Sequence, residues 1–228
     1  MSFILNIDTA TVTAHVSISE NGVVVRSYQN DSQKDHASFL QPAIERLVKD
    51  TMIPLKDMDA IAITAGPGSY TGLRVGMASA KGLCYALNKP LITLSTLEVL
   101  TVSAIRQMAD QPAGDTVLYC PMIDARRMEV FTAVYDRQLV AKLVPQALIL
   151  DEHSFKDILS NNPVIFFGSG APKWKAACTS PNAGFKTVPI LPGAMSYLSD
   201  LYLSNNRFAD LAYCEPFYLK EFQTVISK

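Results

Sequence analysis

The sequence predicts an α/β protein of two lobes, each a mixed sheet with helices, the second lobe being reduced. Three observations support this fold class: strand and helix patterns alternate along the chain, part of the pattern recurs in the second half, and 49% of the 228 residues are apolar. This length and apolar content suffice for one large domain or two smaller ones with a real core.

The chain opens with a predicted meander. The stretches Phe3–Asp8, Thr11–Ser19 and Gly22–Tyr28 have strand character, and Asn21-Gly22 between the last two is a strong hairpin signal. A helical pattern follows from about Ala37 to Lys49. Its apolar face consists of Leu40, Ile44, Leu47 and Val48, with Pro42 at a kink or restart.

Strands and helices alternate after this point. The expected elements are a strand over Ala60–Ala65, a helix over 71–88, a strand over Leu91–Leu94 and a helix from Thr96 to about Met108. The resulting order is β-β-β-α-β-α-β-α.

Part of this order recurs around Asp124. Met122–Val130 parallels Asn6–Ala14, because both read as strand, aspartate, turn and strand. The second copy continues with a strand near Leu139–Leu148, a helix near Ser154–Leu159 and a strand over Val164–Phe167. Two copies with aspartate at the first hairpin predict the two-lobed actin-like architecture of sugar kinases and heat-shock ATPases. We expect lobes over residues 1–108 (joined by the C-terminal segment 210–228) and 109–209.

In ATPases of that architecture, the hairpin after each lobe's first strand holds nucleotide phosphates, and glycine in the turn lets backbone amides approach. Neither turn has glycine here, so ATP hydrolysis is not expected. What remains is at most weak or vestigial ATP or ADP binding at a degenerate site formed by Asp8, Thr9, Thr11 and Asp124. Asp8 has two interpretations, a metal- or water-binding carboxylate or a hairpin aspartate that caps its own turn, and we favour the second.

Residues 66–76 compress a tight turn and a glycine-bearing helix start into eleven residues. Pro67 fixes its own φ, and Ser69 or Thr71 can cap the helix. No Gly-Lys-Ser/Thr follows, so this is not a Walker A loop, and the glycines at 66, 68 and 72 miss the dinucleotide spacing by one residue. The alternatives are a packing turn, which we favour, and an anion site at the helix start.

The full stretch, Gly66-Pro67-Gly68-Ser69-Tyr70-Thr71-Gly72-Leu73-Arg74-Val75-Gly76, resembles the signature of the TsaB (YeaZ) family. That family is the dimerisation subunit of the bacterial enzyme that makes threonylcarbamoyladenosine in tRNA. The resemblance covers nearly the whole chain, through Ile7-Asp8-Thr9, His36, Asp124-Ala125-Arg126-Arg127 and the tail Pro216-Phe217-Tyr218-Leu219-Lys220.

The resemblance implies a non-catalytic scaffold that binds a paralogous TsaD-type catalytic subunit. Together with a TsaE-type ATPase, such a complex modifies adenosine 37, so tRNA would be bound through the complex; a homodimer is another pairing. TsaD carries His-x-x-x-His on the equivalent first helix, whereas here His36 is followed four residues later by Leu40. Rival functions are a small-molecule kinase or ATPase, which would need phosphate-turn glycines, and a metallopeptidase, which would need the second histidine.

The helix over 71–88 is the candidate interface. Arg74, Lys81 and Asn88 form one narrow polar stripe, and most other positions are apolar or small. Gly72, Gly76 and Ala80 form a row that lets another backbone approach closely. The interface would comprise Leu73, Gly76, Met77, Ala80, Lys81 and Cys84, with His36, Leu40 and Ile44 of the preceding helix. The alternative is that these helices pack together within one chain, and both interpretations hold if the two helices form half of an intermolecular four-helix bundle.

Charge and composition limit the other functions. A formal net charge of −1 lacks the basic footprint of a free-standing tRNA binder, so any nucleic-acid contact must be local or shared. Arg126 and Arg127 are either a solvated pair or a contact with a partner carboxylate or tRNA phosphate, and both can serve one site only if both lie in the turn.

Other segments carry weaker signals. No C-x-x-C pair occurs and the three histidines are scattered, so no metal site is expected. With neither a signal peptide nor a membrane-spanning run, the cytoplasm is the expected location. The aromatic residues of 216–222 predict an ordered tail.

Overall fold

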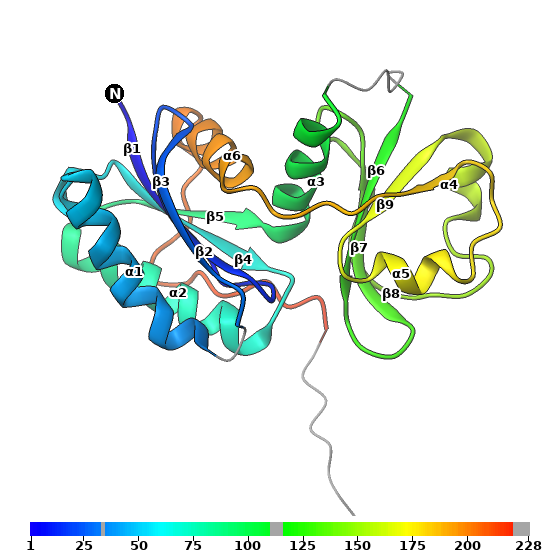
Figure 1. The fold of residues 1–228 in the computed structure, drawn as a ribbon, viewed down its shortest axis with the longest axis horizontal. Helices are drawn as coiled ribbons and strands as arrows, with labels where there is room; N and C mark the ends of the chain where they lie inside the picture. The colour runs from blue at the N-terminus through cyan, green and yellow to red at the C-terminus, as the bar shows by residue number, and fades with distance from the viewer. Residues whose placement is uncertain (33–34, 110–115, 221–228) are drawn as a thin grey trace, which may run out of the picture.

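The computed structural model describes residues 1–32, 35–109 and 116–220, which form two lobes around two five-stranded sheets (Figure 1). The first sheet has the order β3-β2-β1-β4-β5, and the second has the order β10-β9-β6-β7-β8. The first five strands are β1 (Phe3–Asp8), β2 (Ala14–Glu20), β3 (Val23–Asn30), β4 (Ala60–Gly66) and β5 (Leu91–Ser95). The others are β6 (Leu118–Asp124), β7 (Glu129–Tyr135), β8 (Ala141–Ile149), β9 (Val164–Phe167) and β10 (Ala183–Phe185).

The two sheets repeat one topology. In each, the first three strands pair antiparallel, the fourth strand pairs in parallel with the first, and the fifth pairs in parallel with the fourth. Strand β6 therefore corresponds to β1, β7 to β2 and β9 to β4. The expected two-lobed architecture of mixed sheets and the repeat around the two aspartates are both confirmed.

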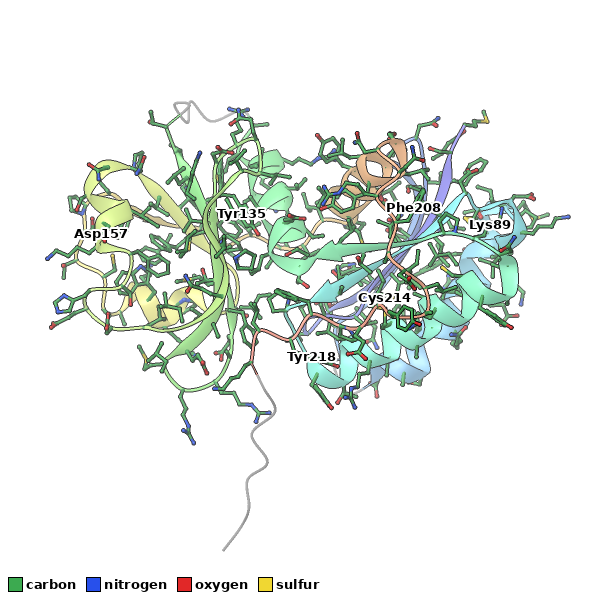
Figure 2. The ribbon with its side chains drawn as sticks, turned by 180° about the vertical axis from the view of Figure 1, so that it is seen from behind. Lys89, Tyr135, Asp157, Phe208, Cys214 and Tyr218 are labelled. Atoms are coloured by element: carbon green, nitrogen blue, oxygen red, sulfur yellow. The ribbon has the colours of Figure 1, made fainter. Side chains whose placement is uncertain are left out.

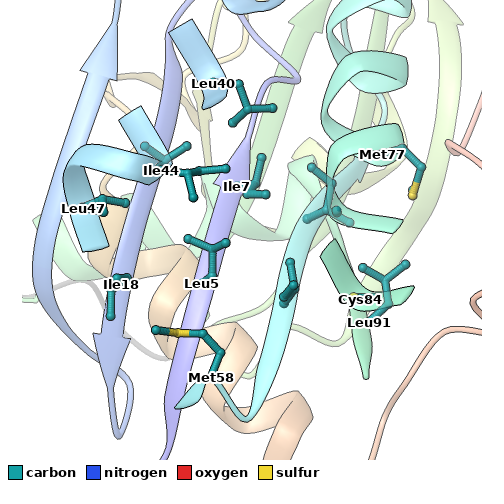
Figure 3. Packing of buried hydrophobic residues seen from close by; sticks show 14 of the residues in the cluster. Leu5, Ile7, Ile18, Leu40, Ile44, Leu47, Met58, Met77, Cys84 and Leu91 are labelled. Carbon is teal, nitrogen blue, oxygen red and sulfur yellow. The ribbon is translucent and has the colours of Figure 1, made fainter. Parts of the chain in front are cut away.

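Helices α1 (His36–Thr51) and α2 (Tyr70–Leu87) cover one face of the first sheet. Figure 3 shows side chains of α1 pointing between those of β1 and β2, where they bury Leu5, Ile7 and Ile18. The corresponding helices of the second lobe, α4 (Lys156–Asn161) and α5 (Ala171–Lys175), are short, as expected for a reduced lobe. A 3-10 turn, η2 (Leu55–Asp57), precedes β4.

Helix α3 (Thr96–Gln107) lies between the lobes (Figure 1). Val99 and Val102 pack with the first sheet, whereas Leu97 and Leu100 pack with the second. Because both sides of the helix are buried, α3 shows no clear polar face.

Helix α6 (Pro192–Ser204) packs on the first sheet, although the sequence assigned residues 109–209 to the second lobe. Its Met195 and Leu198 lie in one cluster with Ile4 of β1 and with α3. The boundary at residue 209 is therefore wrong, and α6 belongs with the first lobe. Helix α6 itself was not predicted from the sequence, nor were α5 and β10, whose five and three residues are too short for a periodic pattern.

Residues 209–220, which we call the C-terminal strap, return to the first lobe and lie along α2 (Figure 2). The Ala209 N–H donates to the carbonyl of Leu91 at 2.8 Å, and the Phe217 N–H donates to that of Ala65 at 2.7 Å. Tyr218 packs against Tyr70 with ring centroids 5.4 Å apart. The predicted order of the tail is confirmed for residues 216–220, while residues 221 and 222 lie outside the described part.

Candidate functional site

The turn at residues 66–76 packs directly on the hairpin between β1 and β2. Ser69 is the N-cap of α2, and its Oγ accepts a hydrogen bond from the Gly72 N–H at 3.3 Å. The Ser69 N–H donates to the Ala10 carbonyl at 2.7 Å, so a backbone donor of the turn is used inside the chain. Of the two predicted caps, Ser69 is confirmed, and Thr71 lies exposed within the first turn of the helix.

Three glycines make this contact possible. A Cβ atom would lie 2.2 Å from the Ala10 oxygen if placed on Gly68, and 2.1 Å from the Thr9 oxygen if placed on Gly72. On Gly76 it would lie 2.3 Å from Thr9 Oγ1. The Thr9 hydroxyl also donates to the Gly72 carbonyl at 2.7 Å. The glycines therefore serve close packing within the chain, which confirms the packing turn. These residues do not form a glycine-lined phosphate cradle.

Asp8 caps its own turn at the base of this hairpin. Its Oδ1 accepts from the Ala10 N–H at 3.0 Å and from Thr64 Oγ1 at 2.7 Å. The carboxylate is 1% exposed, and its Oδ2 has no partner among the described residues. The capping interpretation of Asp8 is confirmed. Thr9 is buried beside it, and Thr11 donates its hydroxyl to the Thr13 carbonyl within the turn, so β2 starts at Ala14 instead of Thr11.

Two buried histidines flank the same hairpin. His15 lies opposite Asp8 in the β1–β2 register, and burial lowers its pKa more than the carboxylates of Asp8 and Asp31 raise it. His36 is 2% exposed, and its Nε2 lies 2.9 Å from the Thr11 carbonyl, to which it must donate. Leu40, one turn further along α1, is part of the core.

The β6–β7 hairpin repeats the aspartate turn without the burial. The Arg126 N–H donates to Asp124 Oδ1 at 2.6 Å, as the Ala10 N–H does to Asp8. Burial acts to raise the pKa of Asp124, but hydrogen bonds from Lys173 and from the Arg126 backbone outweigh it and lower the pKa. Both arginines lie in the turn, with φ of 69° for Arg126 and 50° for Arg127.

A glycine pair that sequence analysis missed supports the second hairpin. Gly168 and Gly170 come just after β9, much as Gly66 and Gly68 stand at and just after the end of β4. A Cβ atom on Gly168 would lie 2.4 Å from the Met122 oxygen, and Ser169 Oγ accepts from the Asp124 N–H at 3.0 Å. The Gly-x-Gly spacing after a strand in both halves was the available signal.

The predicted interface residues are mostly buried inside the chain, which corrects that assignment. The buried ones on α2 are Leu73, Gly76, Met77, Ala80 and Cys84. Those on α1 are His36, Leu40 and Ile44. Gly76 faces the β1–β2 hairpin, and Ala80 is 0% exposed. Lys81 donates to the carbonyls of Ala212 and Cys214 in the strap, which covers the side of α2 that the sequence left unpaired.

A different side of α2 faces outward. Its exposed residues Ala78, Gly82, Tyr85 and Ala86 form what we call the outer strip. Gln41 Nε2 of α1 donates to Ser79 Oγ at 3.2 Å beside this strip and ties the two helices together. Arg74, also exposed, donates to the Tyr218 hydroxyl at 3.1 Å. The outer strip is the part of α2 that a partner could reach.

The chemistry available in the described residues is limited. Burial raises the pKa of the Cys84 and Cys120 thiols to about 12, so neither is a thiolate nucleophile at neutral pH. No group of three histidine, cysteine or acidic residues in the described ranges could hold a metal ion. Hollows of about 370 Å³ and 590 Å³ lie beside the strap and around Trp174 in the second lobe. None of the described helices is both long and apolar enough to cross a bilayer.

The sequence is similar to proteins of tRNA modification. The family model of TsaD, tRNA N6-adenosine threonylcarbamoyltransferase, matches residues 12–171. The chain is 32% identical over 168 residues to the tRNA threonylcarbamoyladenosine biosynthesis protein TsaB of Bacillus subtilis (strain 168), covering 72% of this chain and 70% of that protein. It is also 32% identical over 134 residues to TsaB of Escherichia coli (strain K12), covering 59% of this chain and 55% of that protein.

Solved structures agree on the fold. YeaZ from Pseudomonas aeruginosa superposes with a TM-score of 0.79 at 24% identity, covering 96% of this chain and all (100%) of that one. An inorganic polyphosphate/ATP-glucomannokinase from Arthrobacter sp. strain KM superposes with a TM-score of 0.52 at 12% identity, covering 91% of this chain and 100% of that one. The fold is thus the actin-like fold of sugar kinases, and the sequence relatives show that the chain belongs to the TsaB (YeaZ) family.

Proposed function

We propose that this chain is a non-catalytic subunit that binds a paralogous TsaD-type transferase and supports threonylcarbamoylation of adenosine 37 in tRNA. Family membership and the names of its relatives as tRNA threonylcarbamoyladenosine biosynthesis proteins support the pathway. A TsaE-type ATPase would supply ATP hydrolysis, and the complex would act on tRNA in the cytoplasm.

The main support for partner binding is the exposed position of Gly82 on the outer strip. A Cβ atom on Gly82 would meet nothing within 4 Å, whereas Gly72 and Gly76 are required by contacts inside the chain. An exposed glycine within a helix costs about 1 kcal/mol relative to alanine. The chain itself gains nothing from Gly82, but a partner helix that packs closely on α2 would. Tyr85, 84% exposed one turn away, offers such a partner a large apolar contact. A homodimer would use the same strip.

The absence of catalysis by this chain alone is the second part of the proposal. One carboxylate oxygen of Asp8 accepts hydrogen bonds from its own turn and from Thr64, and the β1–β2 hairpin fills the space beside the glycines of the 66–76 turn. Nucleotide binding would then be vestigial. The test is the purified chain with threonylcarbamoyl-adenylate and unmodified tRNA: we expect modification only after the TsaD-type subunit is added. Modification by this chain alone would contradict the proposal.

Two arginine substitutions on opposite sides of α2 test the interface. Gly82→Arg places a cation in open solvent and removes an exposed helix glycine, so the melting temperature should hold or rise by about 2 to 4 °C while co-elution with the TsaD-type subunit is lost. Ala80→Arg buries the cation in the core and should cost about 3 kcal/mol or more of the free energy of unfolding. Unchanged co-elution of Gly82→Arg would reject the outer strip, and a wild-type chain that binds no TsaD-type subunit would reject the function.

A further inference from the structure

The turn between β6 and β7 has a backbone that favours glycine but carries two arginines. Arg126 and Arg127 both have positive φ, at 69° and 50°. Glycine adopts this conformation without steric cost, whereas other residues rarely do. Residues held in such a conformation cluster at functional sites, where surrounding contacts keep them in place.

The contacts that hold this turn come from its backbone and from Asp124. The Arg126 N–H donates to Asp124 Oδ1 at 2.6 Å, and the Glu129 N–H donates to the Arg126 carbonyl at 3.1 Å. The Ala125 N–H closes the hairpin by donating to the Glu129 carbonyl, also at 3.1 Å. Neither guanidinium takes part in these bonds. The arginine side chains are thus unnecessary for the shape of the turn.

The acidic residues of the hairpin are already neutralised by lysines from elsewhere in the chain. Lys173 of α5 lies 2.7 Å from Asp124, and Lys220 of the C-terminal strap lies 2.5 Å from Glu129. Within the described residues, the exposed guanidinium groups of Arg126 and Arg127 have neither an ion pair nor a hydrogen bond. This one turn therefore presents uncompensated positive charge on a chain whose formal net charge is −1.

We propose that Arg126 and Arg127 bind the phosphodiester backbone of tRNA. The inference rests on the proposed function and names the part of this subunit that the substrate touches. Guanidinium groups match phosphate oxygens with two parallel hydrogen bonds. Both arginines are exposed, so an extended backbone can reach their guanidinium groups. A contact made by two adjacent arginines in one turn is also compatible with the formal net charge of −1, because the contact is local and the partner subunit would share in binding the tRNA.

The test compares tRNA binding by the complex of full-length chain and TsaD-type subunit. The double variant Arg126→Gly/Arg127→Gly removes both charges and relieves the backbone, so its melting temperature should hold or rise. Affinity for unmodified tRNA should fall about sixfold per arginine in 0.1 M salt, and the slope of log affinity against log salt should decrease in magnitude by about 0.7 to 0.9 per lost contact. The double variant Arg126→Lys/Arg127→Lys keeps both charges and should retain most of the tRNA affinity and most of the salt slope.

Arg137→Gln is the matched control, because Arg137 is exposed on the β7–β8 turn at the other end of the same strand. It should bind tRNA like the wild type. Wild-type affinity and salt slope in the double glycine variant would overturn the tRNA contact while leaving co-elution and modification, and with them the proposed function, intact. Loss of co-elution in that variant would instead assign the arginines to the partner protein and also overturn the inference.

Discussion

The two hairpins that follow β1 and β6 have the same topology and the same aspartate turn but opposite surroundings. Asp8 is 1% exposed beneath α2, whereas Asp124 is exposed and pairs with Lys173. The difference comes from the helix after the fourth strand of each sheet. Helix α2 has 18 residues and glycines that admit the hairpin, whereas α5 has five residues and leaves its hairpin open.

The same hairpin motif is thus used for two purposes within one chain. The first hairpin has become part of the core, where Asp8 Oδ1 and the Thr9 hydroxyl are hydrogen-bonded within the chain and Asp8 Oδ2 has no partner among the described residues. The second retains an exposed turn whose side chains can meet a ligand.

Gly72→Ala should be the most damaging small change at the first hairpin. Its Cβ would lie 2.1 Å from the Thr9 backbone oxygen, and backbone cannot move aside cheaply. We expect a loss of about 3 kcal/mol, which lowers the melting temperature by roughly 6 to 12 °C. Gly82→Ala on the same helix is the control and should stabilise the chain by about 1 kcal/mol. Equal melting temperatures for the two variants would show that α2 does not clamp the hairpin.

Asp8→Ala should cost more than Asp124→Ala. The first change leaves the buried Ala10 N–H and Thr64 hydroxyl without their acceptor, at about 2 to 3 kcal/mol in total. The second removes a solvent-accessible turn and ion pair, worth about 1 kcal/mol. Urea unfolding of both variants measures the difference, and a larger loss at Asp124 would reverse the comparison.

His15 should make stability depend on pH. Burial lowers its pKa below the unfolded value of about 6.5, so the unfolded chain binds more protons once the pH falls below that value. Stability is therefore retained above about pH 6.5 and decreases below it, by at most about 1.4 kcal/mol per pH unit. Melting temperatures between pH 7.5 and 5.5 should fall less steeply for His15→Gln than for the wild type. His153 is exposed, so His153→Gln should keep the wild-type dependence of melting temperature on pH. Identical slopes for all three proteins would show that His15 is not the source of the pH dependence.

Most of the long elements and the repeat could be predicted from the sequence because their signals are local, but the 13-residue helix α6 was not predicted. Strands β1 and β9 were predicted at their observed bounds, and the helix expected over 71–88 is α2. The partner of each face of α2 could not be predicted, because burial under the C-terminal strap depends on contacts more than 120 residues apart, such as Lys81 with Cys214. Ala80 and Gly82 are both small, and only the fold shows that one is buried and the other exposed.

The late position of α6 and the strap in the chain has a consequence for synthesis. Strands β1 to β5 leave the ribosome first, but α6 and residues 209–220, which complete the burial of their sheet, are made much later. The strands of the second sheet are contiguous between residues 118 and 185, so that sheet can form before the first is covered. We therefore expect the second sheet to form before the first lobe is complete, and until then the growing chain exposes an apolar sheet face that chaperones can bind.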